Sequence, residues 1–512
     1  MTVTYEPARN PKMTAPGKSA RLVFVISDLH LGGEAEEGPP PSPNVEPSKR
    51  KRGFRICTHE AELAEFINAL AGINRAAVEL VINGDMVDFL AERTGNDEKQ
   101  WSPFHYPESV ALARFADIIR RSAVVFNALK GFVTTPNHRL VILPGNHDLE
   151  LNLPAVRRRL REAVGATGAA DYEFIAHGEA YRVGDVLIEH GNRLDDMNFA
   201  DYAVMRHLCG LLSRGMAVDP KFEFRPPAGS ELVAQVMNDL KKDYGFIDLL
   251  KPEAEAAFPV ILALAPERRS KLVSVAWMLY KGKQRRKEQL RRYESNISAV
   301  EADAGSRKAI APKRRSDPLG DLLEKTVHRR DFAKPARTQR RSTSGTSEIS
   351  LLDQASTLLA LLKGKPEECW DESRLFDLRD ALLAFQGQNC FDQLKETDVK
   401  YLEGAEALAF EPIRHVVFGH THLAKRVKLT RGGYYFNSGT WADLLELPRA
   451  ILDQSRTLLP LADLKAFVKD LVIGDYTKHQ IFHPTYVRFV QDTGGNSVEA
   501  KLVDYRPGDP VS

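Results

Sequence analysis

The chain has 512 residues, of which 43% are hydrophobic, which suits a globular protein with a large core and roughly three domains. Its 71 Lys and Arg against 69 Asp and Glu leave a formal net charge of +2, which excludes a strongly basic or acidic protein and favours no particular partner. The four cysteines form no C-x-x-C pair, so a disulfide framework or a thiolate zinc knuckle is not expected and a reducing compartment is favoured.

The first 20 residues have no apolar core of signal-peptide length, and the longest apolar stretch, 256–266, is too short to span a bilayer. We therefore expect a cytoplasmic protein without a transmembrane segment, with residues 1–20 as a disordered leader. The Pro-rich, charged stretch 34–53 predicts a mobile loop.

Short apolar runs that end in polar turns recur through the first part of the chain. The strands predicted from these runs are 21–27, 77–83, 139–143 and one within 182–195. Helices are predicted over 58–74, with Thr58 as the cap, and over about 108–130. This alternation predicts an α/β sheet buried between helices, with a site at the strand ends.

The pattern changes after residue 195, and the chain to about 405 is mostly helix-patterned and charged, as in 231–250 and 350–364. Within it, 304–347 carries twelve Lys and Arg against four Asp and Glu. That stretch is either a solvated linker or a patch that attracts nucleic acid or an anionic membrane. Strands then return over 414–422 and 434–441, and 484–505 predicts a β-hairpin.

Five strand ends carry Asp, Asn or His side chains. They are Asp28-x-His30, Gly84-Asp85-x-x-Asp88, Gly145-Asn146-His147-Asp148, His190-Gly191 and Gly419-His420-x-His422. These groups offer hard oxygen or imidazole ligands and no sulfur, which suits divalent Mn, Fe, Zn or Co. One such turn could be a simple cap, but the order and local spacing of all five together are specific.

The five motifs resemble the signature of the calcineurin-like metallophosphoesterase superfamily: D-x-H, G-D-x-x-D, G-N-H-D/E, a lone H and G-H-x-H. The resemblance covers about 21–195 and 410–505. It implies a four-layer β-sandwich flanked by helices, interrupted by a large, mainly helical insertion. The expected division is a first core part at 21–195, an insertion or cap at 196–408 and a second core part at 409–512.

The resemblance also implies a role for each motif residue. One metal would be held by Asp28, His30, Asp85 and His422, and the other by Asp85, Asn146, His190 and His420. Asp85 would bridge two divalent ions, with Mn²⁺ expected first and Fe, Zn or Co as alternatives. A hydroxide shared by the metals would attack phosphorus, while Asn146 and His147 contact the phosphoryl oxygens. His147 could instead protonate the leaving oxygen, and Asp148 would orient it by accepting a hydrogen bond.

Three neighbouring residues leave alternatives open. Asp88 either orients a ligand or caps a helix. Arg193 either binds substrate phosphate or pairs with Asp195. Asn437, in a turn after a strand, is expected to be structural rather than catalytic. His105 could lie near the mouth of the site.

The sequence thus predicts a hydrolase, a dinuclear metal-dependent phosphoesterase acting as a phosphodiesterase or a phosphatase. One alternative is a UDP-2,3-diacylglucosamine diphosphatase, which "DLHLGG" and "HGNRLD" resemble. That branch usually has Arg in place of His147, Asp in place of Asn192 and a shorter insertion. Further alternatives are a nuclease that uses the basic insertion and a scaffold that binds metal without turnover. The insertion itself either controls substrate access or is a surface elaboration.

Overall fold

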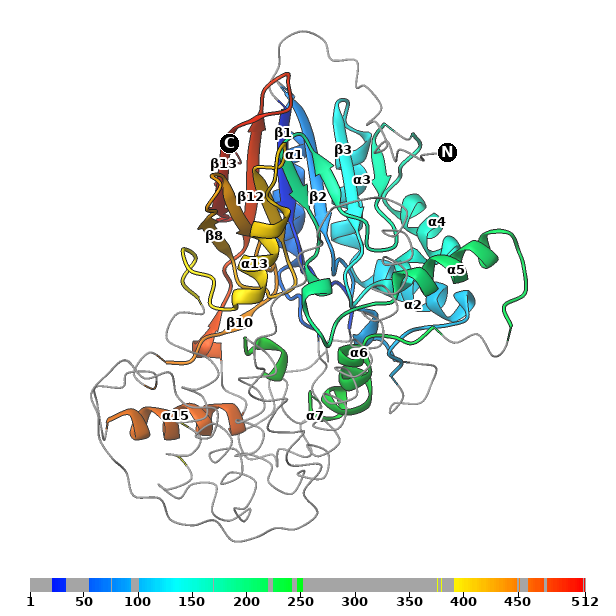
Figure 1. Cartoon of the computed structure of the whole chain (residues 1–512). Coiled ribbons are helices and arrows are strands. Elements are labelled where there is room, and N and C mark those ends of the chain that lie inside the picture. The colour runs from blue at the N-terminus through cyan, green and yellow to red at the C-terminus, as the bar shows by residue number, and fades with distance from the viewer. Residues whose placement is uncertain are drawn as a thin grey trace, which may run out of the picture.

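The computed structural model has two β-sheets at its centre, with helices on both outer sides (Figure 1). The structure describes residues 21–33, 55–74, 76–93, 101–168, 170–219, 224–241, 246–251, 375, 379, 391–448, 451, 459–473, 477–509 and 511. The predictions made for 1–20, 34–53, 304–347 and 350–364 concern residues outside these ranges.

The first sheet has six strands in the order β13-β12-β1-β2-β3-β4. Its parallel part consists of β1 (Arg21–Ile26), β2 (Ala77–Asn83), β3 (His138–Leu143) and β4 (Tyr172–Phe174). The predicted C-terminal hairpin, β12 (Thr485–Gln491) and β13 (Ser497–Asp504), extends it antiparallel to β1. The parallel register places the ends of β1, β2 and β3 at one edge of the sheet.

The second sheet has five strands in the order β5-β6-β7-β9-β8. These are β5 (Tyr181–Val183), β6 (Val186–Ile188), β7 (His415–Phe418), β8 (Lys425–Lys428) and β9 (Tyr434–Asn437). Strands β6, β7 and β9 are parallel, although 226 residues separate the end of β6 from the start of β7. A separate pair joins β10 (Leu444–Leu445) to β11 (Gln480–Ile481).

The alternation of side chains along the strands explains how the two sheets pack. In β1, Val23 and Val25 lie in a core shared with the second sheet, whereas Phe24 and Ile26 lie in the core shared with the helices. In β7, Val417 enters the core between the sheets, and its neighbours face the opposite side. Successive residues of a strand point to opposite faces, so each strand contributes to two cores.

Helices cover the outer face of each sheet. The first sheet packs against α1 (Glu60–Ala71), α2 (Glu108–Arg121), α3 (Ala123–Thr134), α4 (Pro154–Ala163) and α5 (Tyr202–Ser213). Helix α13 (Val399–Leu408) packs against the outer face of the second sheet. The order helix, sheet, sheet, helix confirms the predicted four-layer fold.

The predicted helix over 108–130 is wrong as a single element, because it is divided at Ser122 into α2 and α3. Ser122 is buried, and its hydroxyl donates to Glu60 Oε1 at 2.7 Å, which anchors the break to α1. Thr58 is not the cap of α1. The cap position is His59, and Thr58 Oγ1 instead donates to Asp443 Oδ2 at 2.8 Å.

Two further elements differ from the predictions. The expected strand within 182–195 begins as the hairpin of β5 and β6, because Gly184 takes a φ of +61° and turns the chain back. Residues 231–250 do not form one helix. They contain the end of α6 (Ala228–Leu232), a π-helix (η5, Val233–Met237), α7 (Asn238–Lys241) and a 3-10 turn (η6, Ile247–Leu249).

Parts of the predicted insertion lie against the sheets or close to their strand ends. Helices α5 and α13 fall within 196–408 but contribute to the cores of the two sheets. Asn238, at the start of α7, donates to the carbonyl of Leu90 at 2.8 Å, close to the Asp88 turn. Helix α15 (Leu459–Ile473) lies away from the sheets in Figure 1.

None of the helices in the described parts of the chain has the length and apolar composition that a membrane span needs. The division of the chain into two core parts and an insertion at 196–408 stays a prediction.

Candidate metal centre

The five predicted motifs meet at one end of the two sheets. Within the first sheet, Asp28 N donates to the carbonyl of Gly84 at 3.1 Å, which ties the loop after β1 to the loop after β2. Between the sheets, the backbone N–H of His420 donates to Asp28 Oδ2 at 3.0 Å. The convergence follows from the parallel strands, whose ends emerge at the same edge.

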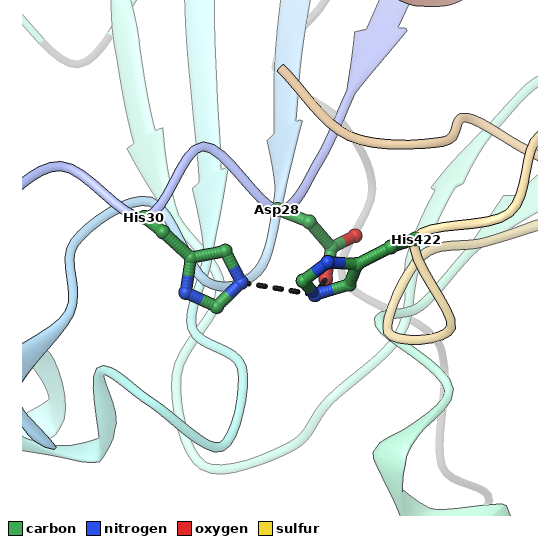
Figure 2. Close-up of side chains that lie close together, drawn as sticks. All are labelled: Asp28, His30 and His422. Carbon is green, nitrogen blue, oxygen red and sulfur yellow. Dashed lines mark hydrogen bonds and ion pairs between the residues drawn. The ribbon is translucent and has the colours of Figure 1, made fainter. Parts of the chain in front are cut away.

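A first group, the His30 cluster, consists of Asp28, His30 and His422, all buried. Nε2 of His30 and Nε2 of His422 lie 3.0 Å apart, and Asp28 Oδ1 lies 3.4 Å from His422 Nε2 (Figure 2). Two imidazole nitrogens and a carboxylate that face one another make a donor set for a divalent cation.

A second group, the His190 cluster, consists of Asp85, His190 and His420, with ligand atoms all within 4.8 Å of one another. His190 Nε2 lies 3.1 Å from Asp85 Oδ2, and Nδ1 lies 2.8 Å from the carbonyl oxygen of Asn83. A carbonyl can only accept, so Nδ1 carries the hydrogen and Nε2 is the nitrogen that faces the carboxylate. This is the arrangement that orients metal-binding histidines.

The backbone is strained at these ligands. Seven non-glycine residues in the described part of the chain have a positive φ, and five of them belong to the two clusters. Their φ values are 54° at Asp28, 47° at His30, 49° at Asp85, 70° at His420 and 63° at His422. Each such residue costs about 1–3 kcal/mol, and this kind of strain collects at functional sites.

Glycines make room for the ligands at two points. A Cβ on Gly145 would lie 2.2 Å from Asp85 Oδ1, and a Cβ on Gly84 would lie 2.2 Å from His190 Nδ1. Gly84 also has a φ of +83°, which a residue with a side chain rarely adopts. The glycines of the G-D and G-N-H-D motifs therefore permit close packing around Asp85.

The buried carboxylates of Asp28 and Asp85 favour positive charge close to them. Burial raises the pKa of Asp28, and the nearby carboxylate of Asp85 raises it further. Burial works against a charged His190, yet the contact with Asp85 raises the pKa of His190 to about 10. Two buried carboxylates close together are stabilised by cations.

The residues present fit metal ions. Oδ1 of Asn146 is buried without a hydrogen-bond partner, while its Nδ2 donates to Asn198 Oδ1 at 3.3 Å. An unpaired buried carbonyl oxygen is costly unless something binds it. Together with the oxygen and imidazole donors of the two clusters, it suits hard or intermediate divalent ions.

The structure corrects the partner expected for His147. Its Nδ1 lies 3.1 Å from Asp88 Oδ1, which makes Asp88 the orienting carboxylate. The prediction that Asp148 orients His147 is wrong, because both of its carboxylate oxygens face backbone amides. Oδ1 accepts from Gly145 N at 2.6 Å and Oδ2 accepts from Met86 N at 2.8 Å. Asp148 thus holds the loops together.

The cap reading of Asp88 is confirmed by its contacts, and the position of Asp88 beside two histidines is consistent with the other reading. Besides His147, its Oδ1 accepts from the N–H of Ala91 at 3.2 Å and caps the 3-10 turn Phe89–Ala91. Its Oδ2 lies 3.4 Å from His30 Nδ1. Burial opposes ionisation, but His147 and His30 hold the pKa of Asp88 well below its usual range.

Arg193 pairs with a different carboxylate from the one expected. Its guanidinium pairs with Glu189, with Nε 2.9 Å from both carboxylate oxygens, so the expected pairing with Asp195 is wrong. The side chain is 41% exposed and lines a pocket beside His190 and Tyr202. Contact with substrate stays a prediction for Arg193.

Two other expectations can be compared with the structure. Asn437 is structural, as expected: it is fully buried and donates to the carbonyl of Gly419 at 2.6 Å, which shapes the turn before His420. His105 is buried rather than exposed at the mouth of the site, with Nε2 3.0 Å from the carbonyl oxygen of Phe89.

Sequence reasoning missed three residues at the centre. Asp195 Oδ2 lies 3.2 Å from His420 Nε2, and Asn198 contacts Asn146. Lys251 is only 6% exposed, and after burial its charge is the largest influence that lowers the pKa of His422. Asp195 and Asn198 follow the His190 turn by only a few residues, so "DDMN" was a local signal. Nothing in the sequence near Lys251 indicated its position.

The sequence of this chain was compared with known protein families, with curated proteins and with solved structures. Residues 22–221 match the family described as calcineurin-like phosphoesterase. This match supports a metal-binding hydrolase that acts on phosphoesters, and the matched family implies divalent ions at the Asp and His clusters. Comparisons with curated proteins and with solved structures give no match.

Proposed function

We propose that the chain is a dinuclear metal-dependent phosphoesterase that hydrolyses a phosphodiester or a phosphomonoester. The observation that carries the proposal is the pair of adjoining clusters at the strand ends. The two are linked through His420, which belongs to the His190 cluster and whose N–H donates to Asp28 of the His30 cluster.

Asp28, His30, Asp85 and His422 would hold one cation, and Asp85, Asn146, His190 and His420 would hold the other. Two divalent cations, when bound, neutralise phosphate oxygens and lower the pKa of a bound water toward neutrality. Mn²⁺ is the first candidate, because the donors are carboxylate, amide and imidazole without sulfur, with Fe, Zn or Co as alternatives.

His147 and Asp88 supply the proton chemistry. The carboxylate of Asp88 accepts at Nδ1 of His147 and stabilises its protonated ring. Nε2 can then donate to a phosphoryl oxygen or give its proton to the leaving oxygen. His147 is partly exposed, with 18% of its side chain accessible, so a substrate can reach it.

The test compares hydrolysis of bis-p-nitrophenyl phosphate with that of p-nitrophenyl phosphate, with Mn²⁺ added back after chelation. We expect metal-dependent turnover that collapses in His147→Ala. His483→Ala is a matched control, because His483 lies at the surface and pairs with Asp504 at 3.0 Å. The faster substrate distinguishes a diesterase from a monoesterase.

Absence of turnover with both compounds, despite two bound metals per chain, would leave either a metal-binding scaffold, which contradicts the proposal, or an enzyme with a very narrow substrate range. A UDP-diacylglucosamine assay would then separate these two. The nuclease alternative depends on 304–347, which lies outside the described residues, and no observed contact favours it.

A further inference from the structure

The loop that follows the His190 turn reaches two residues of the proposed second metal position. Asp195 Oδ2 lies 3.2 Å from His420 Nε2. Asn198 Nδ2 donates to the same Asp195 Oδ2 at 2.9 Å, and Asn198 Oδ1 accepts from Asn146 Nδ2 at 3.3 Å. Asn198 therefore connects Asn146 and His420, which are 274 residues apart in the chain, through Asp195.

These contacts decide which atoms of the two residues are available to a cation. A carboxylate can only accept, so His420 donates from Nε2 to Asp195 and its lone pair lies on Nδ1. Asn146 donates from Nδ2 to Asn198, which leaves Oδ1 as the atom turned away from the loop. That oxygen is the buried acceptor without a hydrogen-bond partner.

The loop itself is held in place from two sides. Met197 N donates to Asp195 Oδ1 at 2.9 Å, and Gly229 N, at the start of α6, donates to the carbonyl of Met197 at 2.7 Å. A Cβ on Gly229 would lie 2.2 Å from Asn198 Oδ1, so any larger residue there would displace the Asn198 amide. Asn192 Nδ2 also donates to the carbonyl of Asn198 at 2.9 Å.

The same residues do not reach the other cluster. Within the described part of the chain, neither Asp195 nor Asn198 hydrogen-bonds to Asp28, His30 or His422. Asp195 and Asn198 would therefore orient ligands of the second metal position and not those of the first.

We propose that Asp195 and Asn198 are positioning residues that set the affinity of the metal position formed by Asp85, Asn146, His190 and His420. This inference rests on the proposed dinuclear function. Partners that orient metal ligands through hydrogen bonds typically contribute about 10–100-fold to metal affinity. Gly229 connects the first part of the insertion to this position.

The experiment is a calorimetric titration of the metal-free, full-length chain with Mn²⁺, supported by the electron paramagnetic resonance spectrum of bound Mn²⁺. Wild type is expected to bind two ions and to show the spectrum of a coupled pair. In Asp195→Ala and Asn198→Ala we expect one site to keep its affinity and the other to weaken by about 10–100-fold. At one equivalent the spectrum should then be that of a single ion.

Two further variants make the result specific. Asp195→Asn keeps an oxygen that can accept from His420 Nε2 but lacks the charge, so its loss should be smaller than that of Asp195→Ala. Asp196→Ala is the matched control, because Asp196 is the exposed neighbour, and its Mn²⁺ binding should equal that of wild type. Thermal unfolding of each metal-free variant checks that it folds.

The two proposals fail in different ways. A wild-type chain that binds fewer than two Mn²⁺ contradicts the dinuclear function itself. A wild type that binds two ions, with Asp195→Ala and Asn198→Ala binding both equally well, overturns the positioning role. Equal weakening of both sites in folded Asp195→Asn also overturns it, since the effect would not be confined to one position.

Discussion

Replacing Asp88 by Asn tests the assignment of the carboxylate that serves His147. The substitution keeps the shape of the side chain and an oxygen that can accept from Ala91 N, and Asn caps helices about as well as Asp. It removes the negative charge that lies 3.1 Å from His147 Nδ1 and 3.4 Å from His30 Nδ1. We therefore expect a folded protein with an impaired proton donor.

The expected magnitude follows from that contact. Positioned acid–base groups contribute about 100- to 10,000-fold to a rate. Loss of the charge that stabilises protonated His147 should thus lower kcat by up to this range, or about 3–5 kcal/mol of barrier. KM should change little, because Asp88 is buried behind His147 and lies away from the surface that a substrate reaches.

The comparison variant is Asp148→Asn. Asp148 accepts from two backbone amides, and Asn can replace only one of these contacts well, so about 1.5–3 kcal/mol of folding free energy should be lost. Its kcat at a temperature where it is folded should fall less than that of Asp88→Asn. Steady-state kinetics, urea unfolding and metal content are measured for both variants.

One outcome would refute the reasoning. If Asp88→Asn binds metal normally and keeps the wild-type kcat while Asp148→Asn loses it, then Asp148 would be the catalytic partner of His147. The sequence-based assignment would in that case be right and the assignment from geometry wrong. Loss of metal in Asp88→Asn would instead show that its contact with His30 dominates.

Three other substitutions have defined outcomes. Gly145→Ala should lower the metal content measured by mass spectrometry, because the new Cβ would lie 2.2 Å from Asp85 Oδ1 and displace it; unchanged content would contradict this packing. Asn437→Ala should lose about 1–3 kcal/mol of unfolding free energy in urea, since it removes one donor to the buried carbonyl of Gly419 and leaves the buried Gly439 N–H without the oxygen that accepts from it. Thr58→Ala should change stability by less than about 0.5 kcal/mol, whereas loss of a true helix cap would cost about 1 kcal/mol.

Much of the fold could be predicted from the sequence because it depends on local patterns. The apolar runs 77–83 and 139–143 became β2 and β3 almost residue for residue, since a short continuous apolar run bounded by turn residues is typical of a strand buried on both faces. The break at Ser122 was missed for the opposite reason. Its hydroxyl bonds to Glu60 on another helix, and helical periodicity carries no sign of that contact.

For the candidate site, the sequence by itself determined which residues follow the strands and therefore meet at one edge. Parallel strands bring their ends together, so Asp28, Asp85 and Asn146 could be placed near one another without coordinates. The glycines in the same motifs were equally readable, because the chain must turn tightly there.

Only the tertiary structure decided where the side chains point after those turns. Asp148 directly follows His147 in the sequence and Asp88 lies 59 residues before it, yet packing of neighbouring loops directs Asp148 to backbone amides and Asp88 to the imidazole. The contact of Asp195 with His420 spans 225 residues and both flanks of the insertion. A turn motif specifies backbone direction, whereas the partner of each side chain depends on which distant segment the two sheets bring against it.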